Sequence, residues 1–350
     1  MRLDGHKLLQ VWQWNTQAEQ TVAAVVRVCR TAGFTGMVVK ALDGATWMGR
    51  VDPTPAALRS VDDARRQAEE SHAAGLVYAV WTIPRDRDLA EQARLTAALA
   101  AAPEIDAVFL DVEPYLPSFW GAWRPAGRAR DFMERIRAAA PDAALVLQPD
   151  PRPGRLAEIR PDEWLPYTSA LAGQHYFHLF ETDPAEEMAR ALALGEQWGL
   201  PVYPTLPGEA SADDLRTAVH ALRGLGGRGC VLFRLGVATA AQLRAVGGVD
   251  FDAVGSAPAS GLPFRTTEAA ALAYVQSRGH TVVPDHAIGR AALTARRLGL
   301  PYLDPGPAVE DEHEELLDGG RWMVQRFTNL TIKWSDATGV LLHPVNARDD

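Results

Sequence analysis

Short apolar segments recur eight times between residues 8 and 235, and this recurrence constrains the fold more than any other feature of the sequence. They cover residues 8–15, 36–42, 76–83, 107–114, 144–149, 170–177, 202–206 and 229–235. Because they lack a regular polar alternation, we expect strands that are buried on both faces of a parallel sheet. Eight strands separated by helical segments predict an α/β fold, a closed (β/α)8 TIM barrel. An open doubly wound sheet is the alternative.

Polar side chains mark the expected helix boundaries. A residue that can accept a backbone N–H bond stands three positions before an acidic or amide residue in the pairs Thr16/Glu19, Ser60/Asp63, Asp88/Glu91, Ser211/Asp214 and Thr239/Gln242. Such pairs are typical of helix starts. Glycines that accept a left-handed backbone mark the expected ends at Gly33, Gly75 and Gly199.

Composition narrows the possible partners. The chain has 350 residues and a formal net charge of −9, and no Lys/Arg cluster is interleaved with aromatics, so we expect no nucleic-acid partner. Cys29 and Cys230 lie in apolar runs and are expected to be buried thiols. No segment approaches the roughly 18 apolar residues of a membrane span. The start of the chain does not resemble a signal peptide, so we expect a cytoplasmic protein or one released to the cell wall by another route.

The fourth apolar segment ends in two carboxylates, Asp111 and Glu113. Side chains alternate across a strand, so both should leave on one face, at the end of a barrel where reactive groups gather. Glycoside cleavage uses two carboxyl groups whose environments separate their pKa values. We therefore expect Glu113, which reaches further out, to be the catalytic acid. Asp111 precedes Glu113 by two residues and lies deeper in the barrel. It could hold Glu113, orient an acetamido group of the substrate, or stabilise positive charge.

Two other interpretations of the acid pair stay open. In a structural role, Asp111 would cap the next loop and Glu113 would form an ion pair with Arg234 or Lys40. In a metal site, Asp111, Glu113 and His175 would be ligands, although histidines are sparse at the strand ends and no H-E-x-x-H motif occurs. Glycosidase chemistry, which needs neither cofactor nor metal, is the leading hypothesis.

The other expected strand ends carry aromatic, amide and charged side chains that suit a glycan substrate better than a phosphate. Aromatic faces can stack on sugar rings, and polar groups can hold hydroxyls. The candidate substrate-binding residues are Trp12, Trp14, Asn15, Lys40, Asp43, Trp81, Tyr115, Gln148, Gln174, Tyr176, Tyr203, Glu209 and Arg234.

Two motifs resemble signatures of the lysozyme-type muramidases, glycoside hydrolase family 25. Leu-Asp-Val-Glu at 110–113 resembles their Asp-x-Glu motif, and Val-Lys-Ala-Leu-Asp-Gly at 39–44 resembles Lys-Ala-x-(Glu/Asp)-Gly. The resemblance implies cleavage of peptidoglycan between N-acetylmuramic acid and N-acetylglucosamine, with Glu113 as the acid and Asp111 assisting the acetamido group. We expect such a hydrolase to retain the anomeric configuration. Chitinase-like family 18 enzymes share Asp-x-Glu, but their longer motif has aspartates where this chain has Val108 and Phe109.

The first expected strand departs from the muramidase pattern. The family begins this strand with an aspartate, whereas residues 11–15 read Val-Trp-Gln-Trp-Asn. The missing carboxylate prompts the alternative hypothesis of a non-catalytic carbohydrate-binding or cell-wall-binding protein on a TIM-barrel scaffold.

The sequence predicts a barrel over residues 1–250, a linker over 251–265 and a small α+β accessory module over 266–350. The linker is rich in Gly, Ala, Pro and Ser. In the module we expect helices over 267–277 and 286–298. Its Leu-Gly-Leu-Pro at 298–301 and its Trp-Ser and Thr-Gly steps within 332–339 resemble the LGFP-type repeat. That resemblance implies a wall-binding or substrate-positioning accessory module; a structural appendage without a ligand is the other interpretation.

Overall fold

The chain divides into two compact units, Met1–Val254 and Gly255–Asp350. In the first unit, the computed structural model describes residues 3–85, 88–113 and 126–251. In the second unit it describes residues 308–317, 320–327, 330–335 and 339–344, with isolated positions between 276 and 292.

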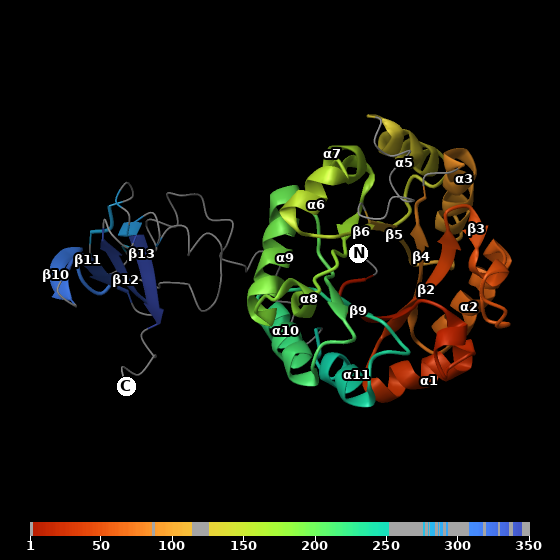
Figure 1. Cartoon of the computed structure of the whole chain (residues 1–350), viewed down its shortest axis with the longest axis horizontal. Helices are drawn as coiled ribbons and strands as arrows, with labels where there is room; N and C mark the ends of the chain where they lie inside the picture. Colours follow the sequence, from red (N-terminus) through yellow and green to blue (C-terminus); the bar gives the residue numbers. More distant parts are fainter. Residues whose placement is uncertain are drawn as a thin grey trace. The chain divides into compact units, whose positions relative to one another are not determined.

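In the described part of the first unit, eight parallel strands form a ring that helices surround (Figure 1). They are β1 (Lys7–Val11), β2 (Gly36–Asp43), β4 (Val77–Ile83), β5 (Ala107–Val112), β6 (Leu145–Pro149), β7 (Ala170–Leu171), β8 (Thr205–Pro207) and β9 (Cys230–Phe233). Ladders join them in the order β7-β6-β5-β4-β2-β1-β9-β8. A short β3 (Thr46–Trp47) pairs antiparallel with β2.

The ring closes between β7 and β8. Isolated parallel bridges join Leu171 to Val202 and Gln174 to Thr205. The Leu171 N–H donates to the Pro201 carbonyl at 2.9 Å, and the Thr205 N–H donates to the Gly173 carbonyl at 2.9 Å. The predicted TIM barrel is therefore confirmed, and the open doubly wound sheet was the wrong alternative. β7 is shorter than predicted because the chain turns after Leu171 into the loop before α8.

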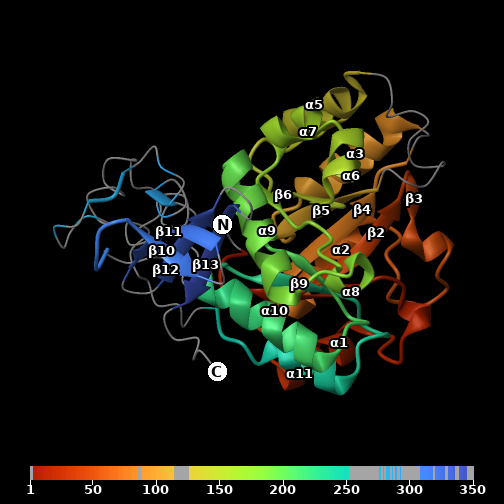
Figure 2. The same cartoon turned by 60° about the vertical axis from the view of Figure 1, so that its left-hand side comes forward.

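Helices pack around the outside of the strands (Figure 2). They are α1 (Val22–Ala32), α2 (Val61–Ala73), α3 (Leu89–Ala100), α5 (Arg128–Ala139), α6 (Pro153–Glu158), α7 (Pro161–Trp164), α8 (Phe177–Phe180), α9 (Pro184–Trp198), α10 (Ala212–Gly224) and α11 (Ala240–Gly247), with 3-10 turns η1 (Trp14–Thr16), η2 (Met48–Arg50) and η3 (Leu165–Tyr167). None of the described helices is long and apolar enough to cross a bilayer.

Most of the predicted helix starts are confirmed. Ser60, Asp88, Ser211 and Thr239 each accept a hydrogen bond from the backbone N–H three residues on. The predicted start at Thr16 is wrong, because Thr21 caps α1 instead. The reason lies elsewhere in the chain: the Asp52 carboxylate accepts the backbone N–H groups of Trp14 and Asn15 and so fixes a separate 3-10 turn.

The barrel core is continuous with the apolar faces of the helices. Val38, Ala79, Leu147 and Val231 are inaccessible to solvent. Cys29 and Cys230 are buried free thiols, as predicted. Burial raises the pKa of both thiols to about 12, so they are protonated near neutral pH.

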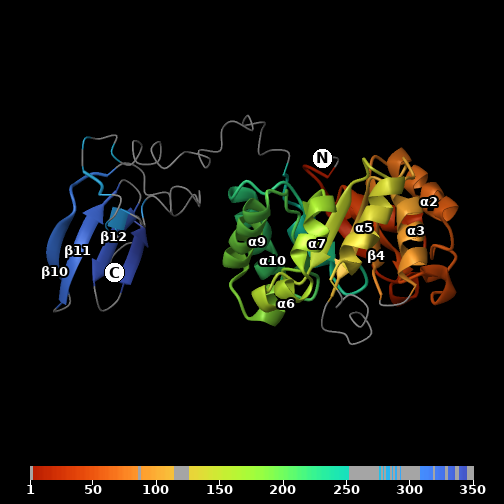
Figure 3. The ribbon, with the colours of Figure 1, turned by 90° about the horizontal axis from the view of Figure 1, so that it is seen from above.

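The described part of the second unit contains a four-stranded antiparallel sheet (Figure 3). Its strands follow chain order as β10 (His313–Leu317), β11 (Gly320–Arg326), β12 (Leu330–Ser335) and β13 (Gly339–Pro344). Val324, Phe327 and Ile332 are buried in this unit. Nearly all of the predicted linker, the two predicted helices and the Leu-Gly-Leu-Pro turn lie outside the described residues.

Candidate active site

The acid pair lies at the carboxyl end of β5. Asp111 is in register with Gln148 of β6. The Gln148 amide nitrogen donates to Gln10 Oε1 at 3.2 Å and to Thr205 Oγ1 at 2.9 Å, and these partners belong to β1 and β8. Gln148 therefore points into the ring, and its register neighbour Asp111 shares that direction. Glu113 follows the last residue of the strand and lies at the carboxyl ends of the strands, the barrel mouth.

One side chain holds both acids. Gln174 Nε2 donates to Asp111 Oδ1 at 2.7 Å and to Glu113 Oε1 at 3.0 Å. An amide nitrogen carries two hydrogens, so each carboxylate receives one. The shared donor confirms that the two acids leave the strand on one face. Among the described residues, neither acid forms the ion pair with Arg234 or Lys40 that a structural role predicted.

The surroundings of the pair favour a retained proton. Burial raises the pKa of Asp111 well above its ordinary value, and the charge of Glu113 raises it further. Burial also raises the pKa of Glu113, and the charge of Asp150 acts in the same direction. Neighbouring buried carboxyls do not both ionise readily, so the pair keeps a proton at a pH where an isolated carboxyl has lost it.

Two cations moderate this effect from one side of the mouth. The Lys40 ammonium donates to Asp43 Oδ2 at 3.0 Å, and Arg85 clasps the same carboxylate with contacts of 2.5 and 3.0 Å. Their charges lower the pKa values of Asp111 and Glu113, although burial outweighs them. Burial disfavours the charged form of Lys40 and so lowers the pKa of its ammonium group, while the charge of Asp43 raises that pKa.

Aromatic rings from different strand ends meet at the mouth. Tyr176 stacks on Phe233, with ring centroids 6.1 Å apart and planes 25° apart. Trp81 meets the edge of Phe233 at 6.4 Å. The Arg234 guanidinium lies 4.0 Å from the centroid of Trp12, and the Lys40 ammonium lies 5.0 Å from that of Trp81. The half-buried Trp12 and Tyr176 therefore contact Arg234 and Phe233, at strand ends that surround the acid pair.

Three predicted substrate-binding residues are placed differently from expectation. Trp14 and Trp81 are 2% and 1% exposed, so protein atoms already cover the faces that were predicted to stack on sugars. The Tyr203 hydroxyl donates to Asp4 at 2.6 Å, and Asp4 precedes β1. Tyr203 thus lies at the amino end of the barrel, and its predicted role is wrong. The apolar run begins at residue 202, but the regular strand begins only at Thr205.

The remaining candidates fall into several environments. Gln148 is buried in the barrel interior, where it forms a polar layer with Gln10 and Thr205. Asn15 and Glu209 are exposed. Tyr115 lies outside the described residues.

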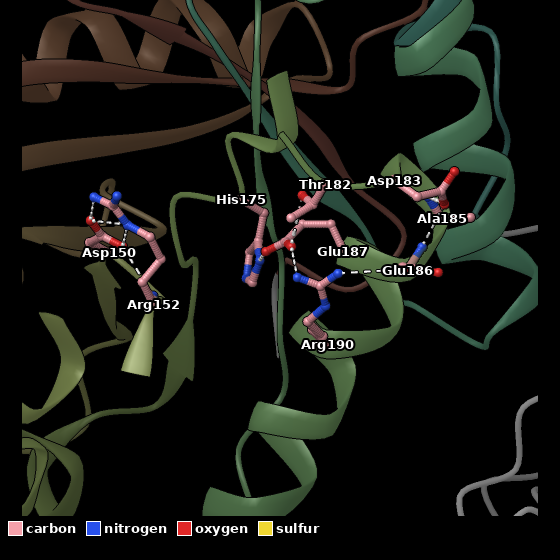
Figure 4. A network of polar contacts seen from close by, with 9 residues as sticks. All are labelled: Asp150, Arg152, His175, Thr182, Asp183, Ala185, Glu186, Glu187 and Arg190. Atoms are coloured by element: carbon pink, nitrogen blue, oxygen red, sulfur yellow. Dashed lines mark hydrogen bonds and ion pairs between the residues drawn. The ribbon is translucent and has the colours of Figure 1, made fainter. Parts of the chain in front are cut away.

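A polar network around the buried Glu187 ties the loop of Gln174 to α9 (Figure 4). His175 Nδ1 lies 2.8 Å from Glu187 Oε1, and Arg190 and Thr182 donate to the other carboxylate oxygen at 3.0 and 3.2 Å. His175 directly follows Gln174, so this network fixes the backbone that carries the bridging amide. The histidine faces α9, and among the described residues no group of three His, Cys, Asp or Glu is arranged to hold a metal ion.

Two further residues near the acids were missing from the predicted site. Asp150 is 2% exposed and binds Arg152 Nη2 at 2.5 Å (Figure 4). Arg85 binds Asp43 from two residues beyond β4. A position just past a strand end was the sequence signal for both.

No family model and no curated protein sequence matches this chain. Among solved structures, an endo-1,4-beta-mannanase from Rhizomucor miehei is similar with a TM-score of 0.53 and 6% identity, over 69% of this chain and 93% of that chain. A chitinase from Chromobacterium violaceum is similar with a TM-score of 0.48 and 12% identity, over 69% of this chain and 98% of that chain.

At these sequence identities the comparisons establish similarity of fold alone. The fold and site together define the first unit as a (β/α)8 barrel with paired carboxyls at its fourth strand. The resemblance to the family 25 muramidases rests on the two sequence motifs.

Proposed function

We propose that this chain is a glycoside hydrolase that cleaves an N-acetylated glycan of the peptidoglycan type, without a cofactor. The observation that carries the proposal is the pair of carboxyls, the buried Asp111 and the partly buried Glu113, held on the one amide nitrogen of Gln174 at the barrel mouth. The half-buried rings of Trp12 and Tyr176 supply apolar surface for a sugar. The barrel fold is compatible with this activity and does not select the glycan.

In the proposed reaction, Glu113 donates its proton to the oxygen of the leaving sugar. The raised pKa values of the two acids keep one proton on the pair closer to neutral pH; in the reactive form Glu113 carries that proton and Asp111 is ionised. Asp111 and Glu113 share one donor on the same side of the ring, an arrangement unlike two acids that face each other across a sugar. We therefore assign the nucleophile to the substrate's own acetamido oxygen.

The acetamido oxygen attacks the anomeric carbon as the glycosidic bond breaks, and a cyclic oxazolinium ion forms. Asp111 orients the acetamido group and stabilises its developing positive charge. The Glu113 carboxylate then takes a proton from a water molecule. The oxygen of this water attacks the anomeric carbon on the face opposite the acetamido oxygen and opens the oxazolinium ring. Two inversions at one carbon give overall retention.

The test is the substitution Glu113→Gln, compared with Glu196→Gln on the exposed surface of α9. We expect the first variant to release reducing ends from purified peptidoglycan at least about 100-fold more slowly than wild type, since a general acid contributes that much or more. The Glu196→Gln variant should match wild type. Equal rates for wild type and Glu113→Gln would contradict the assignment.

One observation favours a second candidate function. The segment at the end of β1, residues 11–15, carries no carboxylate. A carbohydrate-binding protein that has lost turnover would have this feature. If wild-type protein sediments with peptidoglycan and releases no reducing ends from any N-acetylated glycan, the enzyme proposal fails and the binding function replaces it.

A further inference from the structure

Arg234 stands at the barrel mouth with its guanidinium stacked on aromatic rings. It follows the last residue of β9, and its guanidinium carbon lies 4.0 Å from the centroid of Trp12 and 5.5 Å from that of Phe233. Stacking orients a guanidinium and leaves its edge N–H groups free to donate. The side chain is partly exposed, so a ligand can reach those donors.

The other described cations of the mouth have carboxylate partners within the protein. Lys40 and Arg85 bind Asp43, and Arg152 binds Asp150. Among the described residues, Arg234 forms no ion pair and donates no side-chain hydrogen bond. Glu209 is near enough for its charge to act on Arg234, but no ion pair joins them. Arg234 is thus an oriented cation whose strong donors are unused.

The two aromatic rings that Arg234 contacts also contact residues around the acid pair. Trp12, on which it stacks, also lies 5.9 Å from the Lys40 ammonium, whose charge acts on Asp111. Phe233 stacks on Tyr176, two residues after the Gln174 that binds both acids. A ligand group on Arg234 would therefore belong to the sugar in the site or to its neighbour.

We propose that Arg234 binds a carboxylate carried by the sugar substrate, so that the site selects an acidic N-acetylated glycan over a neutral one. The inference rests on the proposed function, which places a sugar at the mouth. A planar guanidinium matches the two oxygens of a carboxylate in a bidentate contact. A single guanidinium balances one negative charge, which suits a carboxylate better than a doubly charged phosphate.

The experiment measures binding by calorimetry for two forms of one ligand. The first is a peptidoglycan glycan oligosaccharide freed of its peptides, which has free lactyl carboxylates; the second is the same oligosaccharide after conversion of those groups to methylamides. Wild type should bind the acidic form about tenfold more tightly, as expected for one charge-assisted contact. Arg234→Gln should lose that preference and keep its affinity for the methylamide.

Arg228→Gln is the matched control, because Arg228 lies just before the other end of β9 and is 58% exposed. It should behave as wild type. Equal affinity of wild type for both forms, no binding of either form, or an equal loss of both affinities in Arg234→Gln would overturn the inference.

Reducing-end release from the same two samples separates this inference from the proposed function. Preferential binding of the acidic form without cleavage of either form would refute the hydrolase and support the carboxylate contact. Equal binding and cleavage of both forms would support the hydrolase and refute the contact.

Discussion

Gln174 uses one nitrogen to hold two acids, and this contact determines how the pair can work. A hydrogen bond from the amide favours the ionised form of each acid and so lowers its pKa, while burial raises both values by more. The alternation of a strand predicted that the acids share a face. It could not predict the bridging contact, because that depends on how the loop after β7 returns over β5.

At the residue scale, Asp111→Asn should stabilise the protein at alkaline pH. Because the folded-state pKa of Asp111 is raised, its contribution to stability is fully present below the unfolded-state pKa and is lost as pH rises through the folded-state pKa. Asparagine stays neutral. We expect urea unfolding to show a gain of about 1–3 kcal/mol at pH 8, the scale of an unfavourably buried polar group, and little gain near pH 3.

Asp142→Asn is the control for this measurement, since Asp142 is exposed in a turn. Its free energy of unfolding should change by less than about 0.5 kcal/mol at either pH. An Asp111→Asn variant with the same stability difference at pH 3 and pH 8 would show that this carboxyl does not carry a raised pKa.

At the scale of elements, the loop between β7 and α9 couples the buried contact between His175 and Glu187 to the site. Strand number and most helix caps follow from local patterns, because each depends on side chains a few residues apart. The ends of β7 and β8 and the start of α1 do not, because distant residues set them. Asp52 fixes the turn after β1, and the closing bridges use Val202 and Gln174 outside the regular strands.

Glu187→Gln should loosen this loop and change catalysis through Gln174. Loss of the charged partner of His175 and Arg190 should reduce stability by about 1–3 kcal/mol and lower kcat by more than it raises KM. Because the Gln174 bonds lower the pKa values of both acids, weaker bonds should move the alkaline limb of the kcat/KM profile to higher pH.

Glu186→Gln tests whether this effect is specific. Glu186 precedes Glu187 on α9 and binds Arg190 on the surface, where it is 72% exposed. Its removal should change stability by less than about 1 kcal/mol and leave the pH profile unchanged. A Glu187→Gln variant that is less stable but has the wild-type pH profile would restrict Glu187 to a structural role.

At the scale of the whole molecule, the barrel brings the carboxyl ends of its strands to one mouth. This geometry made it possible to predict the acid pair together with Lys40, Gln174, Tyr176 and Arg234 from strand ends alone. The same approach misplaced Tyr203, because an apolar run does not reveal where its regular strand starts. The wall-binding role of the second unit stays a prediction from motif order.

The anomeric configuration of the first product shows whether the acid pair acts together with the acetamido group of the substrate. Proton NMR can follow early hydrolysis of an oligosaccharide that contains N-acetylmuramic acid and N-acetylglucosamine. An acid pair that acts with the substrate's acetamido group predicts a first product with the configuration of the cleaved bond. A first product of inverted configuration, or an oligosaccharide that stays intact with the wild-type protein, would rule out this mechanism.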